Sequence, residues 1–126
     1  MCHHQYLRIM NIREKVEKMD ALVSQGDILN AVKNYFGEEA ETSDYGQVQT
    51  RGKDQMVEKM EGFLGSIEKV NEITHHHTIA DELVSASEFT FDFDMKDGSK
   101  IHWHEIIRRE WKDSGEVIRE EYFQAA

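Results

Sequence analysis

Residues 83–95 read LVSASEFTFDFDM, and from Phe89 onward an aromatic side chain occupies every second position. In an extended chain Phe89, Phe91 and Phe93 share one face. The opposite face carries only polar side chains: Glu88, Thr90, Asp92 and Asp94. Alternation of this kind is typical of a strand with one buried and one solvated face. The stretch therefore predicts a strand of an antiparallel sheet whose aromatic face lines an interior.

The following apolar stretch, residues 100–112, predicts the neighbouring strand, and the connection between the two leaves two pairings open. One of its faces carries Ile101, Trp103, Glu105 and Ile107. The other carries His102, His104, Ile106 and Arg108. A two-residue turn at Asp97-Gly98 would place the phenylalanines beside the histidines. A three-residue loop with Gly98 in the left-handed region would place them beside Ile101 and Trp103 instead.

The hydrophobic pattern favours the longer loop. A slip of one residue turns every side chain of a strand to the other face, so register follows burial. We therefore predict an interior that contains Glu105 among apolar side chains, namely Phe89, Phe91, Phe93, Trp103 and Ile107. The opposite face then carries polar residues, including Asp92, His102, His104 and Arg108.

The rest of the chain places helices first and strands after them. A 3.6-residue apolar period predicts a helix from Ile12 to Gly26, a second from Asp27 to Gly37 and a third from about Lys53 to Gly65. Short strands fit around residues 40–44 and 47–50. Further strands are predicted over residues 66–79 and 117–124, giving a C-terminal meander of four strands. This order indicates an α+β fold.

Length and charge limit the possible functions. The 126 residues suffice for one domain, which we place at residues 12–126 after an N-terminal tail of residues 1–11. The net charge of −10 disfavours nucleic acid and anionic membrane surfaces as partners. No run is long and apolar enough for a membrane span. The single cysteine, Cys2, fits a reducing cytoplasm, where we expect the protein to reside.

Three short motifs occur in an order that resembles the nuclear transport factor 2-like superfamily, which includes ketosteroid isomerases and SnoaL-like polyketide cyclases. The motifs are Gln25-Gly26-Asp27, the run from Tyr35 to Ala40, and Arg51-Gly52-Lys53-Asp54. The resemblance covers about residues 12–124. It implies three helices packed on a curved mixed or antiparallel sheet, a cystatin-like cone with an internal pocket. It also implies a homodimer formed through the sheet.

The resemblance to ketosteroid isomerases extends to one catalytic position only. Asp44 falls on the base aspartate of that family. The family's two oxyanion donors would fall on Met19 and Ile107, whose side chains cannot donate a hydrogen bond. Because this chemistry depends on such donors, ketosteroid isomerisation is not expected.

The candidate catalytic residues are Asp44 and Glu105. Burial in an apolar cone raises the pKa of a carboxyl group, so one of them could serve as an acid while the other serves as a base. The alternative is that Asp44 lies at an open rim and that Glu105 pairs with Arg109 or another cation. Glu120 and Tyr122 share a face of the last strand, which the resemblance turns into the cone, so both are candidate ligand contacts.

The run His75-His76-His77 raises the question of a metal site. On a regular strand only His75 and His77 share a face, and two ligands are fewer than a zinc site needs. His102 and His104 could complete such a site only if their strand lay alongside in register. We therefore expect outward-facing histidines, no metal and no cofactor. No phosphate loop or serine-histidine-aspartate order is present.

Two functional hypotheses remain open, with a third behind them. The first is a protein that encloses a small, mostly apolar molecule in the cone. The second is a cofactor-independent isomerase, cyclase or epoxide hydrolase that uses Asp44 or Glu105 as a general base. The third, a non-catalytic dimeric scaffold, requires an exposed apolar sheet face, which the preferred register does not provide.

Overall fold

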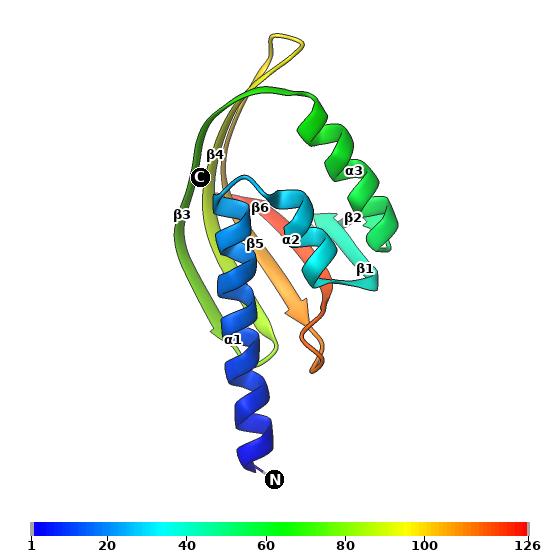
Figure 1. Cartoon of the computed structure of the whole chain (residues 1–126), viewed down its shortest axis with the longest axis vertical. Helices are drawn as coiled ribbons and strands as arrows, with labels where there is room; N and C mark the ends of the chain where they lie inside the picture. Colours follow the sequence, from blue (N-terminus) through cyan, green and yellow to red (C-terminus); the bar gives the residue numbers. More distant parts are fainter. Residues whose placement is uncertain (1, 126) are drawn as a thin grey trace.

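A computed structural model describes the backbone of residues 2–125 and the side chains of residues 12–125. Three helices lie over one face of a curved sheet (Figure 1). They are α1 (Cys2–Ser24), α2 (Ile28–Tyr35) and α3 (Lys53–Gly65). The helix α1 begins at Cys2, earlier than the predicted start at Ile12. The side chains of residues 1–11 lie outside the described part, so the boundary of the domain at residue 12 stays a prediction. None of the described helices is long and apolar enough to cross a membrane.

The sheet has six strands in the order β2-β1-β6-β5-β4-β3. Strands β3 to β6 form the predicted antiparallel meander, and β1 joins it by pairing in parallel with β6. The sheet is thus mixed, and the α+β prediction is confirmed. The strands are β1 (Phe36–Asp44), β2 (Gln47–Arg51), β3 (Ile67–Asp81), β4 (Val84–Met95), β5 (Lys100–Trp111) and β6 (Val117–Gln124).

The second helix ends earlier than the sequence predicts. It stops at Tyr35, and β1 begins at Phe36 rather than near Ala40. Phe36 is extended, lies opposite Val117 of β6 and is buried. Pairing with a strand more than eighty positions away overrides the local helical pattern, a tertiary effect that periodicity does not record.

The β4–β5 connection takes the longer of the two loops. Met95 donates its backbone N–H to the carbonyl oxygen of Ser99 at 2.8 Å, and Gly98 has a φ of 90°. A glycine adopts that left-handed conformation without a steric penalty. As a result Phe91 lies opposite Trp103 and Phe93 lies opposite Ile101. The predicted register is confirmed.

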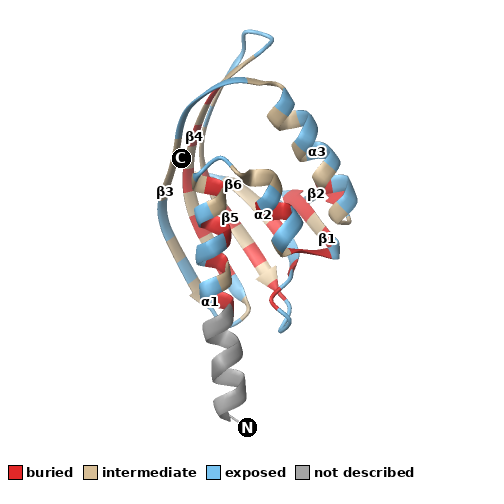
Figure 2. Cartoon of the chain, viewed as in Figure 1, coloured by how far each residue is buried: buried red, intermediate tan, exposed pale blue. Residues whose placement is uncertain are grey.

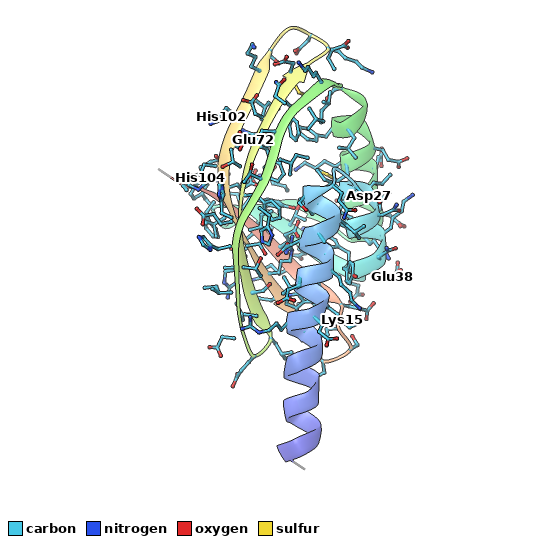
Figure 3. The ribbon with its side chains drawn as sticks, turned by 60° about the vertical axis from the view of Figure 1, so that its left-hand side comes forward. Lys15, Asp27, Glu38, Glu72, His102 and His104 are labelled. Atoms are coloured by element: carbon cyan, nitrogen blue, oxygen red, sulfur yellow. The ribbon has the colours of Figure 1, made fainter. Side chains whose placement is uncertain are left out.

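The two faces of the sheet differ as this register requires. The inner face packs against a stripe of α1 made of Ile12, Val16, Met19 and Val23, all buried (Figure 2). On the outer face His104 contacts Glu88 at 2.6 Å and His102 contacts Asp92 at 3.4 Å. Figure 3 shows both labelled histidines on the side of the sheet away from the helices. The helices therefore cover only the aromatic face.

Candidate ligand cavity

A cavity of about 490 Å³ lies between the helices and the inner face of the sheet. Its apolar wall combines residues from all three helices with residues of β4 and β5. Of the predicted ligand contacts, Phe91, Phe93, Trp103 and Ile107 belong to this wall. The remaining apolar lining comes from the helices: Met19, Val23, Ile28, Ala31, Val32, Met56, Met60 and Phe63.

Phe89 does not line the cavity, although it lies on the same face of β4 as Phe91 and Phe93. Its side chain is 0% exposed. The ring stacks between His75, at 4.8 Å between ring centroids, and Phe91, at 5.5 Å. Phe89 therefore supports the aromatic wall from behind and is not a candidate for direct ligand contact.

Glu105 projects into the cavity from the middle of β5. The residue is 9% exposed, and Gln124 donates a hydrogen bond to its carboxylate at 3.2 Å. Burial raises the pKa of Glu105 to about 7, and the negative charges of Glu120 and Asp44 add to the rise. A carboxyl group with this pKa can both hold and release a proton at neutral pH.

Arg109 does not pair with Glu105, so the structural alternative considered for Glu105 is wrong. The guanidinium of Arg109 contacts Glu120 at 2.7 Å and Asp20 at 2.8 Å. Burial lowers the pKa of Arg109, but the attraction of Glu120 and Asp20 outweighs burial and holds that pKa above its ordinary value. The Nη1 and Nε atoms of Arg109 are therefore already engaged. Among the described side chains, only the amide of Gln124 makes a polar contact with Glu105.

A buried hydrogen-bond network surrounds Arg109 at the inner end of the cavity. Asp20 of α1 accepts hydrogen bonds from Ser87 at 2.5 Å and from Thr78 at 2.6 Å. On β6 the hydroxyl of Tyr122 donates a very short hydrogen bond to Glu120. Burial, together with the charge of Glu120, raises the pKa of Tyr122 well above its ordinary value. Tyr122 thus stays neutral and directs its proton at Glu120 instead of leaving it free for a ligand.

Asp44 lies at the rim of the cavity. It is exposed at the end of β1, as the structural alternative for this residue anticipated, yet it lines the same cavity as Glu105. Lys59 of α3 and Gln124 of β6 also lie on the lining and are exposed. The rim is therefore polar, whereas the interior is apolar apart from Glu105 and the Arg109 network.

The prediction that His75 and His77 share a face is wrong. A bulge between them shifts the β3–β4 register, so that His75 lies opposite Phe89 and His77 lies opposite Glu88. His75 consequently turns inward, where its ring contacts Thr78 at 2.5 Å. Among the described residues no group of three or more His, Cys, Asp or Glu side chains is arranged to hold a metal ion.

Sequence reasoning missed Asp20, Gln124 and Lys59 as parts of this region. For Asp20 a signal was available, because it lies four positions after Val16 and three before Val23, on the apolar stripe of α1. A charge on a buried face needs a partner of opposite charge. Arg109 occupies the matching inward position of β5, between Ile107 and Trp111.

Comparison with known proteins identifies the fold. No protein-family model matches the sequence, and no curated protein sequence matches it either. A protein named as a SnoaL-like polyketide cyclase from Mesorhizobium loti superposes with a TM-score of 0.78 at 20% identity, covering 89% of this chain and 97% of its own. A nuclear transport factor 2-like protein of unknown function from Burkholderia pseudomallei gives 0.72 at 13% identity, covering 91% of each chain.

A third solved structure has the same architecture. It is a hypothetical protein with a ketosteroid isomerase-like fold from Catenulispora acidiphila, in complex with trimethylamine. Its TM-score is 0.70 at 15% identity, covering 89% of this chain and 85% of its own. The chain therefore has the nuclear transport factor 2-like fold, as the sequence motifs predicted.

Proposed function

We propose that this protein binds a small, mostly apolar molecule in the cavity between its helices and its sheet. The observation that carries the proposal is the cavity itself, about 490 Å³ and walled by aromatic and aliphatic side chains with few polar groups. Small-molecule sites in proteins have this size and composition. The Catenulispora neighbour, solved in complex with trimethylamine, supports the view that a protein of this fold can bind a small organic molecule.

The apolar wall also explains why the free energy of an apolar ligand falls when it leaves water and enters the cavity. Phe91, Phe93 and Trp103 line the cavity on the sheet side, and Met60 and Phe63 line it from α3. Removing apolar surface from water stabilises a complex by roughly 25 cal/mol per Å². Open apolar cavities of proteins bind uncharged apolar molecules for this reason.

A neutral apolar fluorophore tests the proposal. We expect N-phenyl-1-naphthylamine to bind with increased fluorescence and with one site per chain. Ala31→Phe fills the cavity from α2, and Met60→Trp fills it from α3, because both side chains line it. Each variant should weaken binding at least about tenfold, because it removes volume that the probe needs. Fluorescence titration measures the affinity.

Ala86→Phe is the matched control. Ala86 lies opposite Arg108 on the outer face, so the same change in size occurs away from the cavity. Circular dichroism verifies that each variant is folded. Equal loss of binding in Ala31→Phe and Ala86→Phe, or full retention in both cavity variants, would contradict the proposal.

Acid/base catalysis in the same cavity is a second candidate function, favoured by Glu105. A carboxyl group with a pKa of about 7, facing an apolar cavity, can remove a proton from a bound substrate or water and return it at another atom. This is the chemistry of a cofactor-independent isomerase, cyclase or hydrolase. Asp44, at the rim, contributes a negative charge that keeps the pKa of Glu105 high.

If the protein has such an activity, substitutions of Glu105 and of Asp44 should change the turnover by different amounts. On a substrate with measurable turnover, Glu105→Gln is expected to lower kcat about 10²-fold to 10⁴-fold, because the proton carrier is lost. Asp44→Asn should leave most of the turnover and shift the pH dependence to lower pH, because it removes a negative charge that raises the pKa of Glu105. If Glu105→Gln keeps full turnover, Glu105 is not the base.

Dimerisation through the outer face of the sheet is implied by the resemblance and stays a proposal. The described part of that face is rich in charge pairs, such as Arg108 with Glu121 at 3.0 Å. A dimer formed there would therefore rest on polar contacts, in contrast to the apolar cavity on the other face. The chain mass of 14.8 kDa makes a dimer easy to recognise by light scattering.

A further inference from the structure

We infer that the ligand of this cavity carries a tertiary or quaternary alkylammonium group on an apolar body, with the cationic group held between the aromatic wall and the Glu105 carboxylate. The inference rests on the proposed binding function and specifies the chemical class of the ligand. Three features of the cavity support it: a connected cluster of aromatic side chains in its wall, the position of Glu105 next to that cluster, and an excess of carboxylates over cations in the lining.

The aromatic side chains that line the cavity form one connected cluster. Trp103 stacks on Phe63 of α3 with 5.8 Å between ring centroids and an interplanar angle of 13°. Phe63 meets Phe93 edge to face at 5.8 Å, and Phe93 lies 5.8 Å from Phe91. Ring faces attract cations, and cages of such rings are a common means of binding alkylated ammonium groups. A purely aliphatic wall would enclose an apolar body equally well but would not attract its charge.

Glu105 occupies the inner-face position next to Trp103 on β5. Successive inward side chains of a strand lie roughly 7 Å apart, which is close enough for one ligand group to contact both. On the neighbouring strands Phe89 lies opposite Glu105 on one side and Gln124 on the other. The carboxylate therefore stands next to aromatic residues in the sheet, and in the described part of the chain its hydrogen-bond donor is the Gln124 amide.

The charges that line the cavity are unbalanced. The carboxylates of the lining are Asp44, Glu105 and Glu120, and its cations are Lys59 and Arg109. Arg109 already contacts both Glu120 and Asp20, and Lys59 is exposed on α3 at the rim. Within residues 12–125, Glu105 thus lies in an apolar interior without a cationic side chain in contact. An anionic ligand would be repelled there, whereas a cationic one would neutralise the carboxylate.

An alkylated ammonium fits this interior better than a primary amine does. A primary ammonium has three N–H donors, and each of them needs an acceptor once it leaves water. The described interior offers few acceptors, since Glu120 is already engaged by Arg109 and Tyr122. A quaternary ammonium has no N–H group and presents methyl groups to the rings. A quaternary ammonium is therefore attracted to the rings and to Glu105, and it loses few hydrogen bonds to water when it enters the cavity.

Two probes of equal shape separate charge from size. Phenyltrimethylammonium and tert-butylbenzene differ only in the replacement of N⁺ by carbon. We expect the cation to bind about tenfold more tightly than its neutral isostere at pH 8, measured by NMR chemical-shift titration of the full chain. The advantage should fall at pH 6, where Glu105 is mostly protonated. The charged and titratable groups that line the cavity with Glu105 are Asp44 of β1, Tyr45 of the β1–β2 turn, Lys59 of α3, Arg109 of β5, and Glu120 and Tyr122 of β6.

Two glutamine variants locate the effect. Glu105→Gln should abolish the advantage of the cation, so that the variant binds the two probes with equal affinity. Glu72→Gln, which removes an exposed carboxylate of β3, is the control and should leave the advantage intact. An equal loss in both variants would mean that the net charge of the chain, and not Glu105, attracts the cation, and would overturn the inference.

The remaining outcomes are distinct. Binding of tert-butylbenzene as tight as that of phenyltrimethylammonium would overturn the ammonium inference while supporting the proposed function. Failure of both probes to bind in the cavity would count against the proposed function itself, and the inference would fall with it.

Discussion

Replacing Arg109 by methionine is expected to destabilise the protein by about 3–5 kcal/mol, the range found when one partner of a buried ion pair is removed. Arg109 is 1% exposed and lies between Asp20 of α1 and Glu120 of β6. Methionine retains much of the volume but leaves two buried carboxylates without their cation. Urea unfolding at pH 7 measures the loss of free energy.

Arg108→Met, one position along β5, is the matched control. Arg108 also contacts two carboxylates, Glu110 at 2.7 Å and Glu121 at 3.0 Å, but on the half-exposed outer face. Exposed pairs contribute little, so we expect a cost below about 1 kcal/mol. Equal costs for the two variants would show that the Arg109 network is no more important to stability than a surface pair.

The raised pKa of Glu105 should make the stability of the protein depend on pH. Its pKa is about 7 in the folded chain and 4.5 as a free side chain. Between these values the folded state holds a proton that the unfolded state has lost, so a rise in pH favours unfolding. The contribution of protonated Glu105 to the free energy of unfolding is fully present below pH 4.5 and is lost as the pH passes about 7. Each pKa unit corresponds to about 1.4 kcal/mol, so the total loss is about 3 kcal/mol.

Glu105→Gln isolates this contribution from every other titrating group. Glutamine resembles the protonated acid and does not titrate, so the free energy of unfolding of the variant should exceed that of the wild type by an amount that grows with pH. Urea unfolding of both proteins at pH 5, 6, 7 and 8 provides the difference. A constant difference across this range would mean that Glu105 ionises normally and is not enclosed in an apolar cavity.

The inner face of the sheet was predictable from sequence because burial and alternation point the same way. The period of two from Phe89 to Phe93, matched to Trp103 and Ile107, determined the register and with it the side of the sheet that the helices cover. The glycine at position 98 made the required loop possible. These are local signals, and the global fold agrees with them.

The polar part of the site was less predictable, because it depends on contacts between distant segments. Asp20 and Arg109 are 89 positions apart, and nothing near either one shows that they meet. Similarly, the bulge beside His76 changes which histidines share a face, and a strict alternation rule cannot detect it. Whether Glu105 pairs with Arg109 could be decided only once both partners of Arg109 were known.

A crystal structure of the protein grown with N-phenyl-1-naphthylamine would test most directly whether the space under the aromatic face of β4 is a binding site. The account predicts the probe between the helices and the sheet, in contact with Phe91, Phe93 and Trp103, while the Arg109 network stays intact. A probe bound only to the outer face of the sheet, with helix side chains closing the cavity, would contradict it.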